Sequence, residues 1–291
     1  MNSIKHKPIV GCMRWGTWGA NFTTSQYQNI IDQCIEIGLN EFDHADIYGD
    51  YTTEAEFGAA LKGNSSLRSK MKIITKCGIK MVSPNRPLHH IKSYDTSKHH
   101  IKTSVETSLK HLHTDYIDTL LIHRPDVLMD THEIAETIDI LKREGKVRSF
   151  GVSNFTTTQV ELINNYVKVE QHQVEISTTN LNAYHNGVLE QAQLKGIAIQ
   201  SWSPLGNGLF DIKTEAHKNI LEVAEQISFV HNTSVPAILL AFLYMHPAKI
   251  TPVMGTTKIE RLKEAKTAMD IQLTRTEFYQ IWTASTGKEV A

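Results

Sequence analysis

A glycine that separates a helical pattern from an apolar run recurs along the chain. It occurs at Gly38, Gly145 and Gly196, where the preceding residues have helical spacing and the following residues are mostly apolar. Glycine suits the left-handed residue that ends many helices, and the short gap that follows is typical of the connection to a strand. The recurring unit therefore predicts helices that alternate with strands, which is the pattern of an α/β fold.

Eight short apolar runs are candidate strands. Several of them lack a strict alternation of polar and apolar residues, which is typical of parallel strands buried on both faces. Between the runs, apolar residues recur at helical spacing, and Thr23 or Thr24 can cap the first helix. The eight runs are residues 8–13, 39–43, 71–76, 116–123, 146–152, 168–174, 196–202 and 249–254.

We predict that these units close into a (β/α)8 barrel, or TIM barrel, which forms one domain over residues 1–291. The alternative is a doubly wound open sheet that binds a dinucleotide. Such a sheet carries GxGxxG after its first strand, whereas residues 11–19 of this chain read GCMRWGTWG and lack that spacing. Segment 79–98 is predicted to be a long loop, and long loops at a barrel mouth are often functional.

The composition argues against several classes of protein. The formal charge is −1, so no basic surface points to nucleic acid. The longest apolar stretch, 235–245, is shorter than the roughly 20 residues of a membrane-spanning helix, and we expect it to be a buried helix. Cys12, Cys34 and Cys77 form no CxxC pair, and the N-terminus lacks the apolar part of a signal peptide. We therefore expect a cytoplasmic protein that binds a small molecule.

Polar residues stand at the C-terminal end of almost every predicted strand. Barrel enzymes place their active sites at these ends, so the agreement in position predicts one shared site on one face. Each residue also has an ordinary interpretation, such as a turn cap for Asp43, a surface position for Lys76, a structural histidine for His123 and a packing tyrosine for Tyr48. The residues concerned are Asp43, His44, Tyr48, Lys76, His123, Ser153, Asn154, Gln173, Trp202 and Ser203.

Four of these residues form a set that suits the reduction of a carbonyl group. A carbonyl that receives hydride becomes an alkoxide and needs a proton, and tyrosine has a reference pKa of about 10. We expect the Lys76 ammonium to lower the pKa of Tyr48, and Asp43 to keep Lys76 charged and in place. A neutral His123 can hydrogen-bond the substrate carbonyl, while a cofactor carries the hydride.

The order of motifs resembles that of the aldo-keto reductases over nearly the whole chain, in the form found in a bacterial subgroup of oxidoreductases. The resemblance implies a catalytic tetrad of Asp43, Tyr48, Lys76 and His123. The matching stretches are VGCMRWGTW (10–18), FDHADIYGDYTTEAEFGAAL (42–61), IITKCGI (73–79), LLIHRPD (120–126), GKVRSFGVSNF (145–155), HQVEIS (172–177), SWSPLGNG (201–208) and GTTKIERLKEA (255–265).

The resemblance also implies a nicotinamide cofactor. Ser153, Asn154 and Gln173 would hold the nicotinamide carboxamide, and Trp202 would stack its flat face on the nicotinamide ring. Segment 203–208 resembles the loop that follows the pyrophosphate, where backbone N–H groups approach phosphate oxygens. That segment consists of Ser203, Pro204, Leu205, Gly206, Asn207 and Gly208.

A late segment would bind the adenosine 2′-phosphate of NADP(H). Many members have a lysine where this chain has Gly255, and Lys258 could supply part of the missing charge. Arg261 matches the family's arginine, and arginine fits a phosphate dianion well. NADPH is therefore the expected cofactor, with NADH as the less favoured alternative; without the other motifs, a solvated helix face would explain these residues. The segment comprises Gly255, Thr256, Thr257, Lys258, Arg261 and Glu264.

Departures from the family pattern bear on the substrate pocket. Many members have aromatic residues at the positions of Gly78 and Arg124, so we expect a roomier and more polar pocket here. Arg124 could attract an anionic substrate or pair with Asp126, and we favour the pair. Trp18 is a candidate wall of the pocket or a core residue. The chain ends soon after Trp282, so we expect little C-terminal lid and an open pocket that accepts several carbonyl compounds.

Two other functions are possible on the same fold. A metal-dependent hydrolase could use Asp43, His44, Asp46 and His123 as ligands, but it leaves Lys76 and the late motifs unexplained, so we predict no metal. A cofactor-sensing regulatory protein would bind the nicotinamide cofactor without turnover, and the complete tetrad favours catalysis over this role. A monomer is implied by the family alone.

Overall fold

The strands close into a barrel in the computed structural model, which describes residues 6–290. Within these residues, eight strands are hydrogen-bonded in the closed order β1-β10-β9-β8-β7-β6-β3-β2. Neighbouring strands whose register is defined pair in parallel, as in β2 with β3 and β6 with β7. The prediction of a (β/α)8 barrel is confirmed.

Each predicted apolar run overlaps one strand of the barrel. The observed strands are mostly shorter than the runs, and each run begins before its strand does. The strands are β1 (Ile9–Gly11), β2 (Glu41–Asp43), β3 (Lys72–Cys77), β6 (Ile117–Ile122), β7 (Val147–Ser153), β8 (Gln171–Glu175), β9 (Ala198–Trp202) and β10 (Thr251–Met254).

The described chain divides into two compact units. The larger unit comprises residues 9–173 and 255–259, and the smaller unit comprises residues 6–8, 174–254 and 260–290. The single domain over 1–291 stays a prediction.

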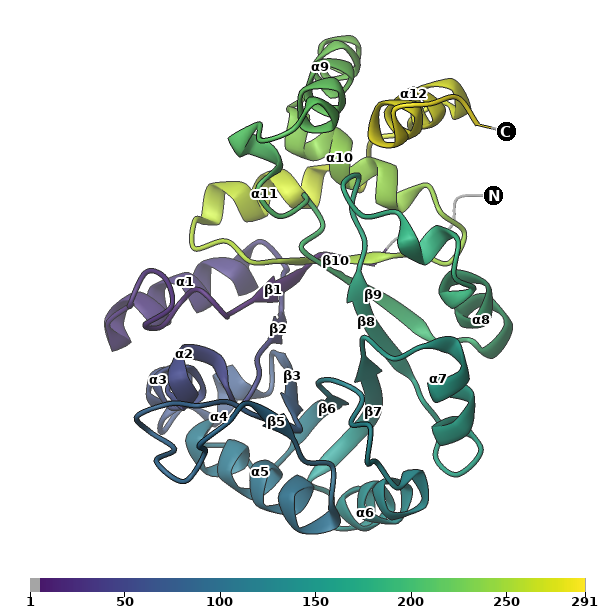
Figure 1. Ribbon diagram of the computed structural model, residues 1–291. Coiled ribbons are helices and arrows are strands. Elements are labelled where there is room, and N and C mark those ends of the chain that lie inside the picture. The colour runs from purple at the N-terminus through teal and green to yellow at the C-terminus, as the bar shows by residue number, and fades with distance from the viewer. Residues whose placement is uncertain (1–5, 291) are drawn as a thin grey trace. The chain divides into compact units, whose positions relative to one another are not determined.

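The larger unit contains the strands from β1 to β7 of the barrel and the start of β8. Its helices lie on the outer side of these strands (Figure 1). Side chains of these strands such as Ile73, Leu121 and Val152 are fully buried. The helices are α1 (Thr24–Glu36), α2 (Tyr48–Tyr51), α3 (Thr53–Leu61), α4 (Ser65–Arg68), α5 (Lys98–His111), α6 (Thr131–Arg143) and α7 (Thr157–Asn164).

The smaller unit is built around helix α10 (Val235–Tyr244), whose side chains are almost all buried, as predicted for 235–245. Phe242 of α10 stacks on Phe278 of α12, with ring centroids 4.4 Å apart. The other helices are η1 (Asn182–Tyr184), α8 (Val188–Lys195), η2 (Leu209–Asp211), α9 (Glu215–Val230), α11 (Ile259–Thr267) and α12 (Arg275–Thr286). Within residues 6–290 no single helix is long and apolar enough to cross a membrane, and α9 and α10 reach that length only as a pair bent by 93°.

Local signals in the sequence set several element boundaries. Thr23 caps α1 through a reciprocal pair of hydrogen bonds with Gln26, which decides between the two candidate caps. Gly38, Gly145 and Gly196 all have the predicted left-handed conformation, with φ of 76°, 72° and 68°. Glycine reaches this region without the steric cost that a Cβ brings.

The prediction of a long loop over 79–98 was wrong in part. Strand β4 (Ile79–Lys80) pairs antiparallel with β5 (Ser93–Tyr94), so the segment is a hairpin with a long connection, and α5 already begins at Lys98. Two-residue strands are too short to produce a periodic pattern, which explains why the sequence did not reveal them.

Candidate active site

The Lys76 ammonium lies in the interior of the larger unit with three acceptors around it. Its side chain is fully buried, and Nζ donates to Asp43 Oδ2 at 2.8 Å, to the His44 carbonyl at 2.8 Å and to the Tyr48 hydroxyl at 2.9 Å. Three partners match the three N–H donors of an ammonium. Burial disfavours the charged lysine, but the Asp43 carboxylate opposes this, and the pKa of Lys76 is raised. Lys76 is therefore a buried cation.

Parallel pairing brings the four tetrad residues to one edge of the sheet. Asp43 ends β2, Lys76 lies next to the end of β3, and His123 directly follows β6. Because β2, β3 and β6 are parallel neighbours, their C-terminal ends lie together. Tyr48 begins α2, in the connection that follows β2. The structure thus brings Asp43, Tyr48, Lys76 and His123 together within the larger unit.

Asp43 is held on both of its carboxylate oxygens. Oδ2 accepts from Lys76, and Oδ1 accepts from the Gln173 side-chain amide at 2.9 Å. Gln173 reaches this place because β8 pairs with β7, where Ser153 is opposite Gln173. Both oxygens of Asp43 are therefore engaged within the tetrad region, and one of them is paired with the Lys76 ammonium.

The Tyr48 hydroxyl points to the Lys76 ammonium, and the ring lies edge-on to His123, with centroids 6.1 Å apart. The Lys76 ammonium lowers the pKa of Tyr48, as expected, but it does not decide the net direction. Burial raises the pKa of Tyr48, the Lys76 charge opposes this, and Asp43 adds to the rise, so that the net change is upward. The resting hydroxyl is therefore protonated, which suits a proton donor.

His123 is neutral for a physical reason. Burial holds the pKa of His123 well below its usual range, and the positive charges of Lys76, Arg124 and Lys92 lower it further. Its buried Nδ1 has no hydrogen-bond partner in the part of the chain that the structure describes. A neutral imidazole can donate one hydrogen bond to a carbonyl oxygen. The lowered pKa is in line with the expected neutral His123.

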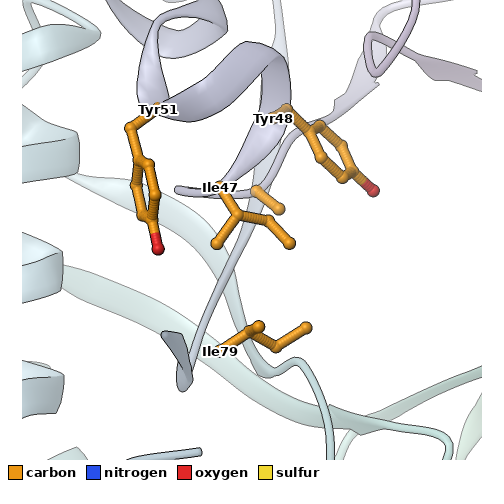
Figure 2. Close-up of a cluster of buried hydrophobic side chains, with 5 residues drawn as sticks. Ile47, Tyr48, Tyr51 and Ile79 are labelled. Atoms are coloured by element: carbon orange, nitrogen blue, oxygen red, sulfur yellow. The ribbon is translucent and has the colours of Figure 1, made fainter. Parts of the chain in front are cut away.

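A small apolar cluster supports Tyr48. Figure 2 shows Tyr48 and Tyr51 leaving the same short helix on either side of Ile47, with Ile79 nearby. Trp18 packs against this cluster; its ring centroid is 6.2 Å from that of Tyr48. Trp18 is half-buried, so it borders the tetrad rather than filling the core.

The residues assigned to the nicotinamide carboxamide form a hydrogen-bonded group in the larger unit. The Asn154 side-chain amide donates to Ser153 Oγ at 2.7 Å, and the Asn154 backbone N–H donates to the Gln173 carbonyl at 3.0 Å. Asn154 is in the left-handed region, with φ of 61°. Amide and hydroxyl groups are the donors and acceptors that a carboxamide needs, so this group fits the expected ligand.

The segment from Gly255 to Lys258 also belongs to the larger unit. The Thr256 carbonyl accepts from Trp15 Nε1 at 3.1 Å, and Thr256 Oγ1 accepts from the Lys258 backbone N–H. Gly255 and Lys258 are exposed. A Cβ on Gly255 would meet nothing within 4 Å, so the missing family lysine is not excluded by space.

The smaller unit contains the other segments assigned to the cofactor. Trp202 ends β9, and Ser203, Gly206 and Gly208 follow in the left-handed region, with φ of 50°, 76° and 75°. A Cβ on Gly206 would lie 2.6 Å from Thr179 Oγ1, so this position has no room for a side chain. Left-handed turn residues can direct backbone N–H groups to an anion. Arg261 and Glu264 lie on α11, where Arg261 is exposed.

A buried carboxyl group beside the tetrad escaped the sequence analysis. Glu54 of α3 is 3% exposed and accepts hydrogen bonds from Thr75 Oγ1 and Ser108 Oγ. Burial raises the pKa of Glu54 to about 7, although the two hydroxyl donors and Lys76 oppose the rise. A glutamate on the buried face of a helix is the only signal that the sequence offered.

Comparison with known proteins decides the family. The model of the Aldo/keto reductase family matches residues 9–285. The chain belongs to this family. As an aldo/keto reductase, it is an enzyme of an oxidoreductase family, and the resemblance in its motifs is confirmed.

Similar proteins cover almost the whole aldo/keto reductase chain. "Uncharacterized oxidoreductase YcsN" of Bacillus subtilis is 41% identical, over 97% of this chain and 95% of that protein. "6-dehydroglucose reductase" of Agrobacterium fabrum is 36% identical, over 95% of each. A crystal structure of a thermostable aldo-keto reductase with the inhibitor epalrestat has a TM-score of 0.79 at 24% identity, over 95% of this chain and 94% of that chain. The last match supports the fold.

Proposed function

We propose that this aldo/keto reductase uses NADPH to reduce the carbonyl group of a small molecule to an alcohol, with Tyr48 as the proton donor. The observation that carries the proposal is the buried Lys76 ammonium, 2.9 Å from the Tyr48 hydroxyl and 2.8 Å from Asp43. Fixed charges that face the site of developing charge are a major source of catalysis.

Proton delivery follows from the protonation states. Tyr48 holds its proton at rest because burial raises its pKa. A bound nicotinamide would supply the hydride. As negative charge develops on the substrate oxygen, the Tyr48 proton moves to it, and the phenolate that remains faces the Lys76 ammonium. Asp43 balances the lysine charge before and after the transfer.

Neutral His123 would orient the carbonyl. An imidazole with one N–H can donate to the substrate oxygen without placing a full positive charge beside Lys76. Protonation of His123 would add a second cation at that place, and burial together with Lys76, Arg124 and Lys92 opposes it.

The expected cofactor contacts follow from the family motif. Ser153, Asn154 and Gln173 would hold the carboxamide, and their hydrogen-bonding groups fit that role. Trp202 and segment 203–208 would face the nicotinamide and the phosphates. Arg261 and Lys258 would bind the 2′-phosphate, which favours NADPH over NADH.

The substrate is best sought among oxidised sugars first. Two relatives, from Agrobacterium fabrum and Novosphingobium aromaticivorans, carry the name 6-dehydroglucose reductase at 36% and 31% identity. Sugar aldehydes and simple aldehydes of similar size should be compared. We also propose that the chain acts as a cytoplasmic monomer and binds neither nucleic acid nor membranes, in line with its charge of −1.

The test has two steps. Titration with NADPH and with NADH, followed by tryptophan fluorescence, should show tighter binding of NADPH. Tyr48→Phe should then lower kcat for carbonyl reduction by roughly 10²–10⁴-fold, the usual contribution of a general acid, with the dissociation constant for NADPH nearly unchanged.

Tyr166→Phe, which changes an exposed tyrosine outside the site, is the matched control. Full activity of Tyr48→Phe would contradict the assignment of the proton donor. Tight NADPH binding without turnover of any carbonyl would favour the cofactor-sensing alternative, and binding of neither nucleotide would overturn the oxidoreductase proposal.

A further inference from the structure

The turn that follows Tyr48 has an unusual backbone. Gly49, Asp50 and Tyr51 are all in the left-handed region, with φ of 59°, 57° and 70°. Glycine and aspartate tolerate this region, but a bulky residue such as tyrosine rarely adopts it. Three such residues in succession need contacts from their surroundings to hold them. The contacts found here come largely from one loop.

Three residues of the connection between β4 and β5, residues 81–92 (the 81–92 loop), contact the side chain of Tyr51. The Met81 backbone N–H donates to the Tyr51 hydroxyl at 2.8 Å, and that hydroxyl lies 3.3 Å from the Met81 carbonyl. His89 Nδ1 lies 3.5 Å from the same hydroxyl and 3.1 Å from the Met81 carbonyl. The Arg86 guanidinium sits 4.3 Å above the Tyr51 ring. Three loop residues thus converge on one side chain.

A second contact joins the same loop to the same turn. The Asn85 side-chain amide donates to the Asp50 carbonyl at 2.9 Å. On its other side, Asp50 Oδ2 accepts from Trp18 Nε1 at 3.2 Å. The left-handed turn is therefore bonded to the 81–92 loop and to Trp18, while most residues of that loop are exposed.

The loop held in this way borders the tetrad. Met81 and Trp18 pack against the apolar cluster that contains Tyr48 and Tyr51. At the other end of the loop, the charge of Lys92 acts on His123. The 81–92 loop consequently borders the cluster that carries the proton donor.

We propose that Tyr51 is a positioning residue that fastens the 81–92 loop to the turn carrying Tyr48, so that the loop is a fixed wall of the carbonyl pocket rather than a free lid. The proposal rests on the proposed function only in what it says of substrate. Tyr51 acts through the loop: its loss should weaken binding of the carbonyl compound and leave proton transfer and the cofactor unaffected.

The first test needs no substrate. In Tyr51→Phe the Met81 amide loses its hydrogen-bond acceptor, and its exchange with deuterium should accelerate about tenfold or more. Amides of the barrel strands, such as those of Ile74 and Leu121, should keep their rates. Asn85→Ala, an exposed position where folding is not at risk, should accelerate exchange in the same loop, and Tyr166→Phe should change nothing. Unchanged exchange in the loop of both Tyr51→Phe and Asn85→Ala would overturn the proposal.

The second test separates substrate binding from chemistry. With a carbonyl compound that the wild-type enzyme reduces, Tyr51→Phe should raise KM by about tenfold, the scale of one hydrogen bond, with kcat and the dissociation constant for NADPH nearly unchanged. A fall in kcat at constant KM would mean that Tyr51 acts on Tyr48 itself, and would refute the role in the loop. If the wild type reduces no carbonyl compound, the proposed function fails, while the exchange rates still decide whether Tyr51 fastens the loop.

Discussion

At the scale of single residues, Glu54 shows how burial changes the pKa of a carboxyl group that no sequence motif singles out. Its carboxyl is surrounded by protein and accepts hydrogen bonds from two hydroxyl groups, those of Thr75 and Ser108. Hydrogen bonds stabilise the ionised form only in part, so desolvation raises its pKa to about 7. The same physical cause raises the pKa of Tyr48, where the sequence predicted the opposite from Lys76 alone.

The raised pKa of Glu54 predicts a dependence of stability on pH. The folded state binds this proton more tightly than the unfolded chain, whose carboxyl has a pKa of about 4.5. The stabilisation of the folded state by this bound proton is therefore complete below pH 4.5 and is lost as the pH rises through about 7. Between pH 5 and pH 8 the wild type should lose up to about 3 kcal/mol in free energy of unfolding through Glu54. Glu54→Gln has no such proton to lose, so its free energy of unfolding should rise relative to that of the wild type by this amount.

Urea denaturation of both proteins at the two pH values measures this difference. Glu144→Gln, which changes a carboxylate at the surface, is the control and should show no comparable gain. A Glu54→Gln variant that follows the wild-type pH dependence would show that Glu54 is ionised throughout.

At the scale of elements, the helix starts were easier to predict than the short strands. A cap is a local pattern: Thr23 and Gln26 are three residues apart, and the reciprocal bonds form within one turn. The hairpin of β4 and β5 pairs residues 79–80 with 93–94. Strands of two residues are too short to show an alternation of polar and apolar residues in the sequence. The register that brings Gln173 to Asp43 is also non-local, since 130 positions separate the two residues.

The capping box of α1 can be tested at this scale. Thr23→Ala removes the acceptor for the Gln26 backbone N–H and should lower the free energy of unfolding by about 1 kcal/mol. Thr24→Ala, at the first position inside the helix, should change it by only a few tenths of a kcal/mol. Chemical denaturation of the two variants beside wild type gives both values. Equal losses in the two would show that the cap bond contributes nothing.

At the scale of the whole molecule, the sequence predicted the fold class and the tetrad for the same reason. Parallel strands that end in polar residues place those residues at one edge whatever their separation along the chain, so Asp43, Lys76 and His123 could be grouped without a known register. The pKa values, the bond between Gln173 and Asp43, and the contacts of Tyr51 depend on packing between distant segments, and no short pattern contains that information.

The prediction of a single domain has its own test. One cooperative domain should unfold in a single transition, with coincident midpoints for different probes. Trp15 and Trp18 report on the larger unit, and Trp202 and Trp282 on the smaller unit. In urea, the fluorescence of Trp202→Phe/Trp282→Phe should give the same midpoint as far-UV circular dichroism of that variant. Two separate midpoints would instead show that the two compact units unfold independently.

The complete set of partners around Lys76 has a consequence for the proposed reduction of aldehydes. A neutral lysine amine attacks an aldehyde to form an imine, which would trap the substrate on the protein. Lys76 is kept protonated by Asp43, and its three N–H groups point to Asp43, His44 and Tyr48. With neither a lone pair nor a free direction of approach, this amine can lie beside a reactive aldehyde without forming a covalent adduct.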